Sequence, residues 1–197
     1  MSKKHSYTTA SYIPWDSAMA LLRKLYRDGD YRMSLLLGCG FFFGLRISDL
    51  LALTWEQILH QDEFVVYEKK TGKRREIIIN KGFQGHIEDC YKAMDVRDTK
   101  QHCFVNRFGG VISVQMVNRL LKDVKTKYQV KVDNLSSHSM RKTWARQIWE
   151  VENAAGRGNL ALLKLSELMS HSSEKITRIY ISLQQQELGA VYDSLQF

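Results

Sequence analysis

The chain has 197 residues, of which 44% are hydrophobic, so it is long enough to bury one substantial core. Its three cysteines are an odd number without a Cys-x-x-Cys pair, which argues against a disulfide framework and favours a reducing, cytoplasmic environment. Lysine and arginine exceed aspartate and glutamate by 29 to 21, a net charge of +8. This excess favours a polyanionic partner, and an ordinary solvated surface is the alternative.

We expect neither a membrane helix nor a secretory signal. The longest apolar stretch runs from Met33 to Leu45, contains three glycines and ends at Arg46, whereas a membrane helix needs about 20 residues. Residues 1–12 include lysines but no apolar core behind them. The expected location is therefore the cytoplasm.

The N-terminal part of the chain is predicted to be helical. Residues 1–12 are expected to form a tail or a linker stub, because the only proline, Pro14, precedes apolar residues at helical spacing. Asp16 is the expected cap of that first helix. A second helix over about 31–43 is apolar nearly all round, so it should lie in the core until Gly44 interrupts it.

The pattern changes after a further helix that Ser48 and Asp49 are expected to begin. The segments 63–68 (EFVVYE) and 75–80 (REIIIN) are rich in β-branched residues. A basic stretch, KKTGKR, separates them. This arrangement predicts a β-hairpin with lysines at its tip.

The rest of the chain is predicted to be mostly helical. A helix is expected at about 83–94, followed by a short extended segment over 102–110 that two glycines close. An amphipathic helix should end at Ser170. The residues expected to begin the other helices are Ser113, Ser136 or Ser137, and Ser173. The predicted fold class is mainly α with a small antiparallel β-sheet, an α+β fold.

Several familiar site types are not expected. The glycines of GCGFFFG (38–44) lack both the spacing and the strand-to-helix context of a dinucleotide site. No histidine or cysteine cluster has the spacing of metal ligands, and no Walker loop occurs. We therefore expect chemistry that uses no metal and no cofactor.

The remaining candidates are cationic and proton-transferring side chains near the ends of expected elements. His138 and Arg141 stand three apart, which places them on one helix face. Each candidate alone has an ordinary explanation, such as a helix-terminal arginine, a solvated turn or a core tyrosine. For Tyr180 the core interpretation rests on a stripe with Ile176, Ile179 and Leu183. The order of the candidates along the chain is the stronger signal: Arg46, Lys70, His138, Arg141, His171 and Tyr180.

Four motifs in this order resemble the catalytic domain of the tyrosine recombinases, the phage integrase family. The family's Gly-Leu-Arg-x-Ser-Glu-Leu box is similar to FGLRISDLLALTW (43–55). Its β-hairpin with a Lys-Thr-Gly-type tip resembles EKKTGKRREIII (68–79). Its His-x-Leu-Arg-His-Ser/Thr-Phe-Ala box is similar to HSMRKTWA (138–145), and its Leu-Gly-His-Ser-Ser-x-x-x-Thr-x-x-Tyr box to LMSHSSEKITRIYIS (168–182). The resemblance covers about residues 13–181.

The resemblance implies a role for each matching position. Arg46 and Arg141 match the family's phosphate clamp, and Lys70 matches its general acid at the hairpin tip. His138 and His171 match the two residues that handle protons, and Tyr180 matches the nucleophile. Lys70 is chosen because it immediately precedes Thr71 and Gly72. We expect the DNA phosphates outside the scission site to be bound by Lys73, Arg74, Arg75, Arg119 and Lys122.

These residue types suit cleavage of a DNA phosphodiester without a metal. Two guanidiniums can stabilise the negative charge that grows on phosphate oxygens in the transition state. A tyrosine hydroxyl has a pKa of about 10, so a base must take its proton and an acid must protonate the leaving deoxyribose oxygen. The expected function is site-specific DNA recombination through a 3′-phosphotyrosine intermediate. The alternatives are relaxation of DNA by a type IB topoisomerase and a non-catalytic DNA-binding regulator on the same fold.

The domain organisation follows from the same resemblance. Residues 13–197 should form the catalytic domain, with 183–197 a segment that docks on a neighbouring protomer or on its own domain. The family's N-terminal core-binding domain is expected to be missing, because residues 1–12 are too short for it, so the chain is either a catalytic-domain fragment or a naturally minimal member. The expected partners are double-stranded DNA, further copies that form a homo-tetramer on that DNA, and either the missing domain or an accessory DNA-binding protein. Ser170 replaces a usual glycine, and Ser182 stands where a histidine is common.

Overall fold

The computed structural model describes residues 10–171 and 173–183. Its internal contacts divide the chain into two compact units, Met1–Trp144 and Ala145–Phe197, named here the N-terminal unit and the C-terminal unit. The boundary falls inside one helix, α7 (Ser137–Ala154).

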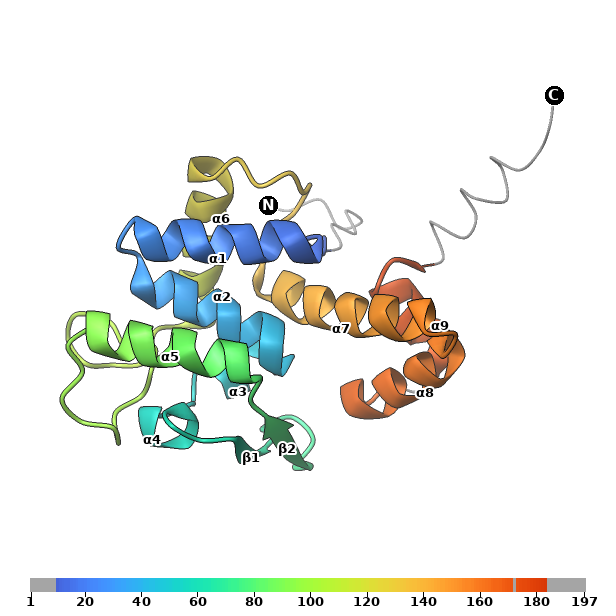
Figure 1. The fold of residues 1–197 in the computed structure, drawn as a ribbon, viewed down its shortest axis with the longest axis horizontal. Coiled ribbons are helices and arrows are strands. Elements are labelled where there is room, and N and C mark those ends of the chain that lie inside the picture. Colours follow the sequence, from blue (N-terminus) through green and yellow to red (C-terminus); the bar gives the residue numbers. More distant parts are fainter. Residues whose placement is uncertain (1–9, 172, 184–197) are drawn as a thin grey trace, which may run out of the picture. The chain divides into compact units, whose positions relative to one another are not determined.

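The described part of the chain is mostly helical with one antiparallel pair of strands, which confirms the predicted fold class (Figure 1). In chain order, the N-terminal unit contains α1 (Trp15–Arg27), α2 (Tyr31–Phe43), α3 (Ile47–Leu50), α4 (Trp55–Ile58), β1 (Glu63–Tyr67), β2 (Arg74–Ile78), α5 (Lys81–Ala93), α6 (Val114–Lys127) and the first turns of α7 (Ser137–Ala154). The C-terminal unit contains the rest of α7, then α8 (Gly158–Met169) and α9 (Glu174–Tyr180).

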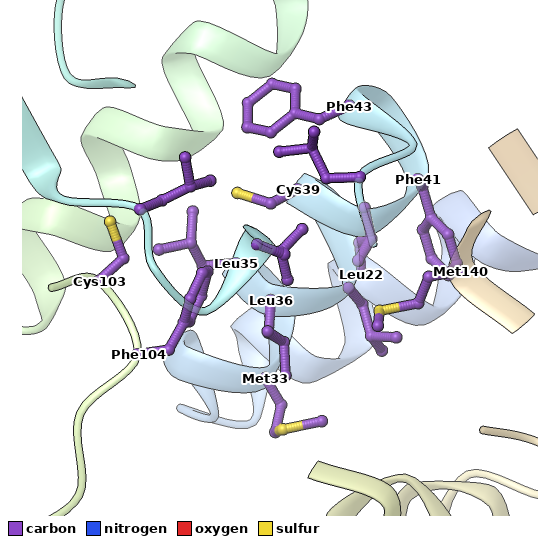
Figure 2. Packing of buried hydrophobic residues seen from close by; sticks show 14 of the residues in the cluster. Leu22, Met33, Leu35, Leu36, Cys39, Phe41, Phe43, Cys103, Phe104 and Met140 are labelled. Carbon is purple, nitrogen blue, oxygen red and sulfur yellow. The ribbon is translucent and has the colours of Figure 1, made fainter. Parts of the chain in front are cut away.

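Helix α2 forms the centre of the N-terminal core, as its composition predicts (Figure 2). It has α1 on one side and α5 on another (Figure 1). Two glycines of α2 permit close packing, because a Cβ at Gly38 would lie 2.5 Å from the ring of Phe83 and one at Gly40 would lie 2.6 Å from the sulfur of Met140. The core fixes the end of α2, where the site begins.

The three cysteines are free and buried, as expected. Burial raises the pKa of the Cys39 thiol and raises that of Cys90 to about 12. Figure 2 shows Cys39 and Cys103 among aliphatic and aromatic side chains. Because such thiols stay protonated at neutral pH, they act as small apolar groups.

Two expectations about helix starts are wrong. Helix α1 begins directly after Pro14, which makes no side-chain cap, and Asp16 lies inside its first turn. Helix α3 begins after Arg46, so Ser48 and Asp49 lie within it, and a separate α4 follows. Asp49 is buried and accepts the backbone N–H of Lys69 at 3.0 Å. A tertiary partner therefore uses the carboxylate that the local pattern assigned to capping.

The expected tail is partly tied to the N-terminal unit. The backbone N–H of Ser11 donates to the carbonyl of Asn134 at 2.9 Å. Ile13 is buried, and its N–H donates to the hydroxyl of Thr143 at 2.8 Å. Residues 1–9 lie outside the described part of the chain.

The hairpin forms as predicted, with Val66 opposite Arg75 and Tyr67 opposite Arg74. Because successive side chains of a strand alternate between its faces, Arg75 shares the buried face with Ile77, whereas Arg74 is exposed. The phase of β2 thus sends one arginine of the basic run into the protein.

In the C-terminal unit, α8 packs against α9. The expected apolar stripe of α9 does not define its buried face, since Ile176 and Ile179 are 41% and 50% exposed while Thr177 is fully buried. Ser173 precedes α9 as expected, but its side chain makes no capping hydrogen bond. Of the proposed docking segment 183–197, Leu183 is buried and the rest lies outside the described residues.

Within residues 10–171 and 173–183, no helix is both long enough and apolar enough to cross a membrane.

Candidate active site

The site in the N-terminal unit begins where α2 ends. Gly44 adopts a left-handed conformation with φ of 58°, and a Cβ there would lie 2.1 Å from Trp144. Only glycine fits this turn, because both the backbone conformation and the indole exclude a side chain. Arg46 follows two residues later, immediately before α3. The tight turn thereby brings Arg46 close to the last carbonyls of α2.

Those carbonyls are held by two other arginines. The Nη1 of Arg141 donates to the carbonyl of Gly44 at 2.7 Å. Arg75 donates to the same carbonyl at 3.2 Å and to that of Phe43 at 2.9 Å. The C-terminal end of a helix leaves such carbonyls without partners and carries partial negative charge, so guanidiniums satisfy and stabilise it. The end of α2 therefore fixes Arg141 in place.

A buried carboxylate joins the two predicted clamp arginines. Glu68 accepts a hydrogen bond from Nη1 of Arg46 and lies 4.0 Å from Nη1 of Arg141. Its other neighbour, the hydroxyl of Thr71, donates at 2.7 Å. Burial by itself would raise the pKa of Glu68, but these hydrogen bonds and the positive charges of Arg46 and Arg141 lower it. Glu68 is thus an anion at neutral pH, and both arginines face it.

Arg75 departs from the expectation that it contacts DNA from the hairpin surface. It is buried, its guanidinium is occupied by the carbonyls of Phe43 and Gly44, and it lies 5.0 Å from the ring centre of Trp144. Burial and the nearby charge of Arg141 lower its pKa to about 10. Arg75 therefore has a structural role, because it binds the Gly44 carbonyl that Arg141 also binds and does not lie on the hairpin surface.

The hairpin tip places Lys70 in solvent, as predicted. Its neighbours hold the tip to the protein, since the N–H of Lys69 donates to Asp49 and the hydroxyl of Thr71 to Glu68. The other expected phosphate contacts, apart from Arg75, are exposed on the hairpin or on α6: Lys73, Arg74, Arg119 and Lys122.

His138 lies one turn before Arg141 on α7. His138 is exposed at the surface, but desolvation of its ring by the surrounding protein and the charges of Lys142 and Arg141 lower its pKa. A pKa below the usual value of about 6.5 leaves the imidazole neutral at pH 7. His138 is therefore available as a proton acceptor beside the clamp.

The C-terminal unit holds the other two predicted residues. The rings of His171 and Tyr180 meet edge to face with centroids 5.3 Å apart. The Nδ1 of His171 is 2.9 Å from the hydroxyl of Thr177, which is 2.6 Å from that of Ser166. A hydrogen bond at one ring nitrogen holds the orientation of the imidazole, and the hydroxyl of Thr177 can donate to that nitrogen or accept from it, depending on the tautomer. The nucleophile predicted from the sequence thus has a positioned histidine beside it.

The six predicted residues fall into two groups. Arg46, Lys70, His138 and Arg141 belong to the N-terminal unit, where Glu68 links the first and last of them. His171 and Tyr180 are in contact within the C-terminal unit.

Sequence reasoning missed the residues that hold these groups in place. Glu68 and Thr177 were not predicted, and Arg75 was assigned to the surface. A signal for two of them was present. Glu68, directly after β1, continues the phase of buried Phe64, and Arg75 is in phase with buried Ile77 along β2. Thr177 belongs to the Thr-x-x-Tyr motif but lies outside the apolar stripe that was expected to face the core.

Comparisons with known proteins identify the family of the chain. Residues 16–187 match the family model described as the phage integrase family. Tyrosine recombinase XerC of Xanthomonas campestris pv. campestris (strain B100) is 30% identical over 155 residues, which are 77% of this chain and 44% of that protein. The probable integrase/recombinase YoeC of Bacillus subtilis (strain 168) is 26% identical over 156 residues, 77% of this chain and 80% of that one. The chain spans less than half of the XerC relative.

Solved structures show the same fold at low sequence identity. XerA recombinase superposes with a TM-score of 0.68 at 18% identity, covering 96% of this chain and 67% of that one. XerH site-specific recombinase, in a post-cleavage complex with its palindromic difH substrate, gives 0.68 at 16% identity over 95% and 54%. With its motifs in order and the family model matched over most of its length, the chain belongs to the phage integrase family and corresponds to the catalytic domain of its tyrosine recombinases.

Proposed function

We propose that the chain cleaves and rejoins DNA strands through Tyr180 in site-specific recombination. The observation that carries the proposal is the pairing of Arg46 and Arg141 with a single carboxylate, because two guanidiniums that face one small anion suit one phosphate. The contact between His171 and Tyr180 supports it from the C-terminal unit. Family membership makes this activity the first to test.

The proposed reaction conserves the energy of the phosphodiester. The oxygen of Tyr180 forms a bond to phosphorus while the bond to the 5′ oxygen breaks, which leaves a 3′-phosphotyrosine and a 5′-hydroxyl. Arg46 and Arg141 hold the non-bridging oxygens and stabilise their growing charge. A 5′-hydroxyl from a partner strand can reverse the attack, so resealing needs no nucleotide.

Two proton transfers accompany the cleavage step. The tyrosine proton moves to His138 or His171, and Lys70 delivers a proton to the departing 5′ oxygen. A neutral His138 beside Arg141 suits the first transfer, because a neutral imidazole can accept a proton. An exposed Lys70 on a tip held by its neighbours suits the second.

DNA affinity outside the scissile phosphate is assigned to exposed basic residues. Lys73 and Arg74 on the hairpin and Arg119 and Lys122 on α6 can pair with backbone phosphates. Each lost phosphate contact should reduce the slope of log affinity against log salt by about 0.9. Comparing Lys73→Ala with wild type across salt concentrations measures this contribution.

The proposed partners are double-stranded DNA and further copies of the chain. The XerH structure contains its difH DNA, and a lambda integrase structure is a dimer bound to a core site. By analogy, we propose a tetramer on two DNA sites, with DNA clamping completed by a core-binding domain or an accessory protein. The protein would then be found with DNA in the cytoplasm.

A nicked suicide substrate tests the proposal. When Tyr180 attacks next to the nick, the short leaving fragment diffuses away and the covalent adduct persists through denaturation. We expect this adduct with the wild type and none with Tyr180→Phe, which lacks only the hydroxyl. DNA binding by Tyr180→Phe must remain, since a loss of binding would also remove the adduct.

The same experiment separates the alternatives. No adduct with a folded, DNA-binding wild type would overturn the proposal in favour of a regulator. An adduct together with relaxation of supercoils, but without recombinant products in the presence of two sites, would indicate topoisomerase activity. The relatives named above are recombinases and integrases, which favours recombination.

A further inference from the structure

Glu68 is a buried acid beside residues that must bind a phosphate. Its side chain is 2% exposed and lies next to Arg46 and Arg141. A carboxylate at this position opposes the negative charge of DNA, and burying it costs free energy. Charge balance alone therefore does not explain why a carboxylate is buried at this position.

The backbone of Glu68 closes the hairpin tip. Its N–H donates to the carbonyl of Lys73 at 3.0 Å, and its carbonyl accepts the N–H groups of Thr71 at 3.2 Å and Gly72 at 2.8 Å. Gly72 takes a left-handed conformation with φ of 66°, which allows the chain to turn back there. Residues 68–73 thus form one closed loop around Lys70.

The side chain of Glu68 ties that loop to the clamp. Its carboxylate accepts from the hydroxyl of Thr71 and from Arg46. On the other side of Lys70, the N–H of Lys69 donates to buried Asp49, which belongs to the helix that follows Arg46. Both neighbours of Lys70 in the chain are therefore attached to the arginine side of the site.

We infer that Glu68 is a positioning residue, which holds the tip through Thr71 so that Lys70 meets the 5′ oxygen of the phosphate bound by Arg46 and Arg141. This inference rests on the proposed function. In it, Glu68 contacts no substrate and acts through Thr71 and the arginines.

A substrate with sulfur in place of the bridging 5′ oxygen distinguishes positioning of the acid from other roles. A thiol has a pKa of about 8.5, so the sulfur departs as a thiolate and needs no proton from Lys70. An alcohol is a far weaker acid, and loss of its general acid costs about 100- to 10,000-fold. Lys70→Ala should therefore be slow on the oxygen substrate and near the wild-type rate on the sulfur substrate.

Thr71→Val and Glu68→Gln should show the same pattern in a smaller degree. We expect cleavage of the oxygen substrate to fall by about tenfold or more, and cleavage of the sulfur substrate to stay within about threefold of wild type. Thr71→Ser keeps the hydroxyl and should recover the rate, which makes it the matched control for Thr71→Val. Thr71→Val leaves the pairing of Glu68 with Arg46 intact, so it remains informative if Glu68→Gln folds poorly.

Equal slowing on both substrates would overturn the inference, because it would assign Glu68 to the clamp or to the fold. A Lys70→Ala variant that sulfur does not rescue would overturn it too, while the Tyr180 adduct would keep the proposed function intact.

Amide hydrogen exchange on the protein without DNA gives a second decision that needs no activity. If Thr71 holds the tip, the N–H groups of Lys69 and Gly72 should exchange with solvent about tenfold faster in Thr71→Val than in the wild type. In Thr71→Ser they should exchange at about the wild-type rate. Unchanged exchange in Thr71→Val would overturn the inference even if the wild type formed no adduct with DNA.

Discussion

The two units hold their reactive residues by different means. In the N-terminal unit, charged groups hold one another, with Arg46 and Arg141 around Glu68 and with Arg75 on the end of α2. In the C-terminal unit, neutral hydroxyls do this work, through the chain from Ser166 and Thr177 to the histidine. The proposed phosphate clamp is therefore built from ions, and the surroundings of the proposed nucleophile, Tyr180, are built from neutral hydrogen-bonding groups.

The difference suits the two tasks. A clamp for a phosphate must keep its positive charges in place before DNA arrives, and buried ionic contacts over-determine their positions. Removing one partner from such a set costs about 3–5 kcal/mol, because the others stay buried without compensation. A neutral hydrogen bond contributes only about 1 kcal/mol. We therefore expect the N-terminal unit to tolerate substitution less well than the C-terminal unit.

Substitution of a clamp arginine should have the largest effect. Arg46→Lys keeps a positive charge but loses the second donor of the guanidinium, so the transition state is held less well. We expect single-turnover adduct formation to slow by about 100- to 1,000-fold, as for the loss of one oxyanion donor. Arg141→Lys should be at least as severe, since Arg141 also binds the carbonyl of Gly44.

The control for the clamp-arginine substitutions is the DNA affinity of each variant, measured by titration at fixed salt. Binding should change far less than the rate, because exposed lysines and arginines elsewhere supply most phosphate contacts. A rate within threefold of wild type in Arg46→Lys would remove Arg46 from the clamp.

Arg75 tests the stability side of the comparison. In Arg75→Met the carbonyls of Phe43 and Gly44 lose donors, and each unsatisfied buried group costs about 1–3 kcal/mol. Relief of repulsion with Arg141 offsets part of this, so we expect the free energy of unfolding to fall by about 2 kcal/mol. Urea denaturation measures it, and Arg74→Met on the exposed face of the same strand is the matched control with a change near zero. Equal values for both variants would show that the buried contacts of Arg75 contribute nothing.

The fold was predictable where a local pattern had no competitor. The all-apolar run of α2, the β-branched strands and the Ser113 cap each had one interpretation, and the Ser113 hydroxyl does accept the N–H of Met116. Local patterns failed at Asp16, because the helix already begins directly after Pro14, and at Asp49, because a tertiary partner uses its carboxylate. Asp49 binds a segment twenty positions away, which no local pattern encodes.

The site was predictable as residues but not as a network. Spacing and resemblance identified Arg46, Arg141 and Tyr180 as candidates. Glu68 escaped because an acid in a basic stretch looks like a solvated charge, although the strand phase places it inside. Thr177 escaped because hydroxyls on a short helix have no preferred face, and only the position of α8 makes that side the buried one.

The hydroxyl chain of the C-terminal unit should give a smaller effect than the clamp. Thr177→Val preserves shape but removes the partner of His171, so the imidazole is no longer held beside Tyr180. We expect single-turnover cleavage to slow by about tenfold, equivalent to about 1.4 kcal/mol, with DNA affinity unchanged. Thr177→Ser restores the hydroxyl and should restore the rate. If Val and Ser were equally active, the hydrogen bond would have no part in catalysis.

Ser170 should show the smallest change, and a gain instead of a loss. It ends α8 in a left-handed conformation with φ of 56°, and its buried hydroxyl has no hydrogen-bond partner among the residues that the structure describes. A side chain in this conformation costs about 1 kcal/mol that glycine avoids. Ser170→Gly should therefore raise the free energy of unfolding by about that amount, less the stabilisation of the unfolded chain by the greater freedom of glycine. Ser173→Gly, at an extended position with φ of −161°, is the control without that gain. If Ser170→Gly is more stable but cleaves DNA more slowly, the backbone strain before His171 helps to place the imidazole. If it is more stable and cleaves at an unchanged rate, the serine is a local departure from the family's glycine without a role in cleavage.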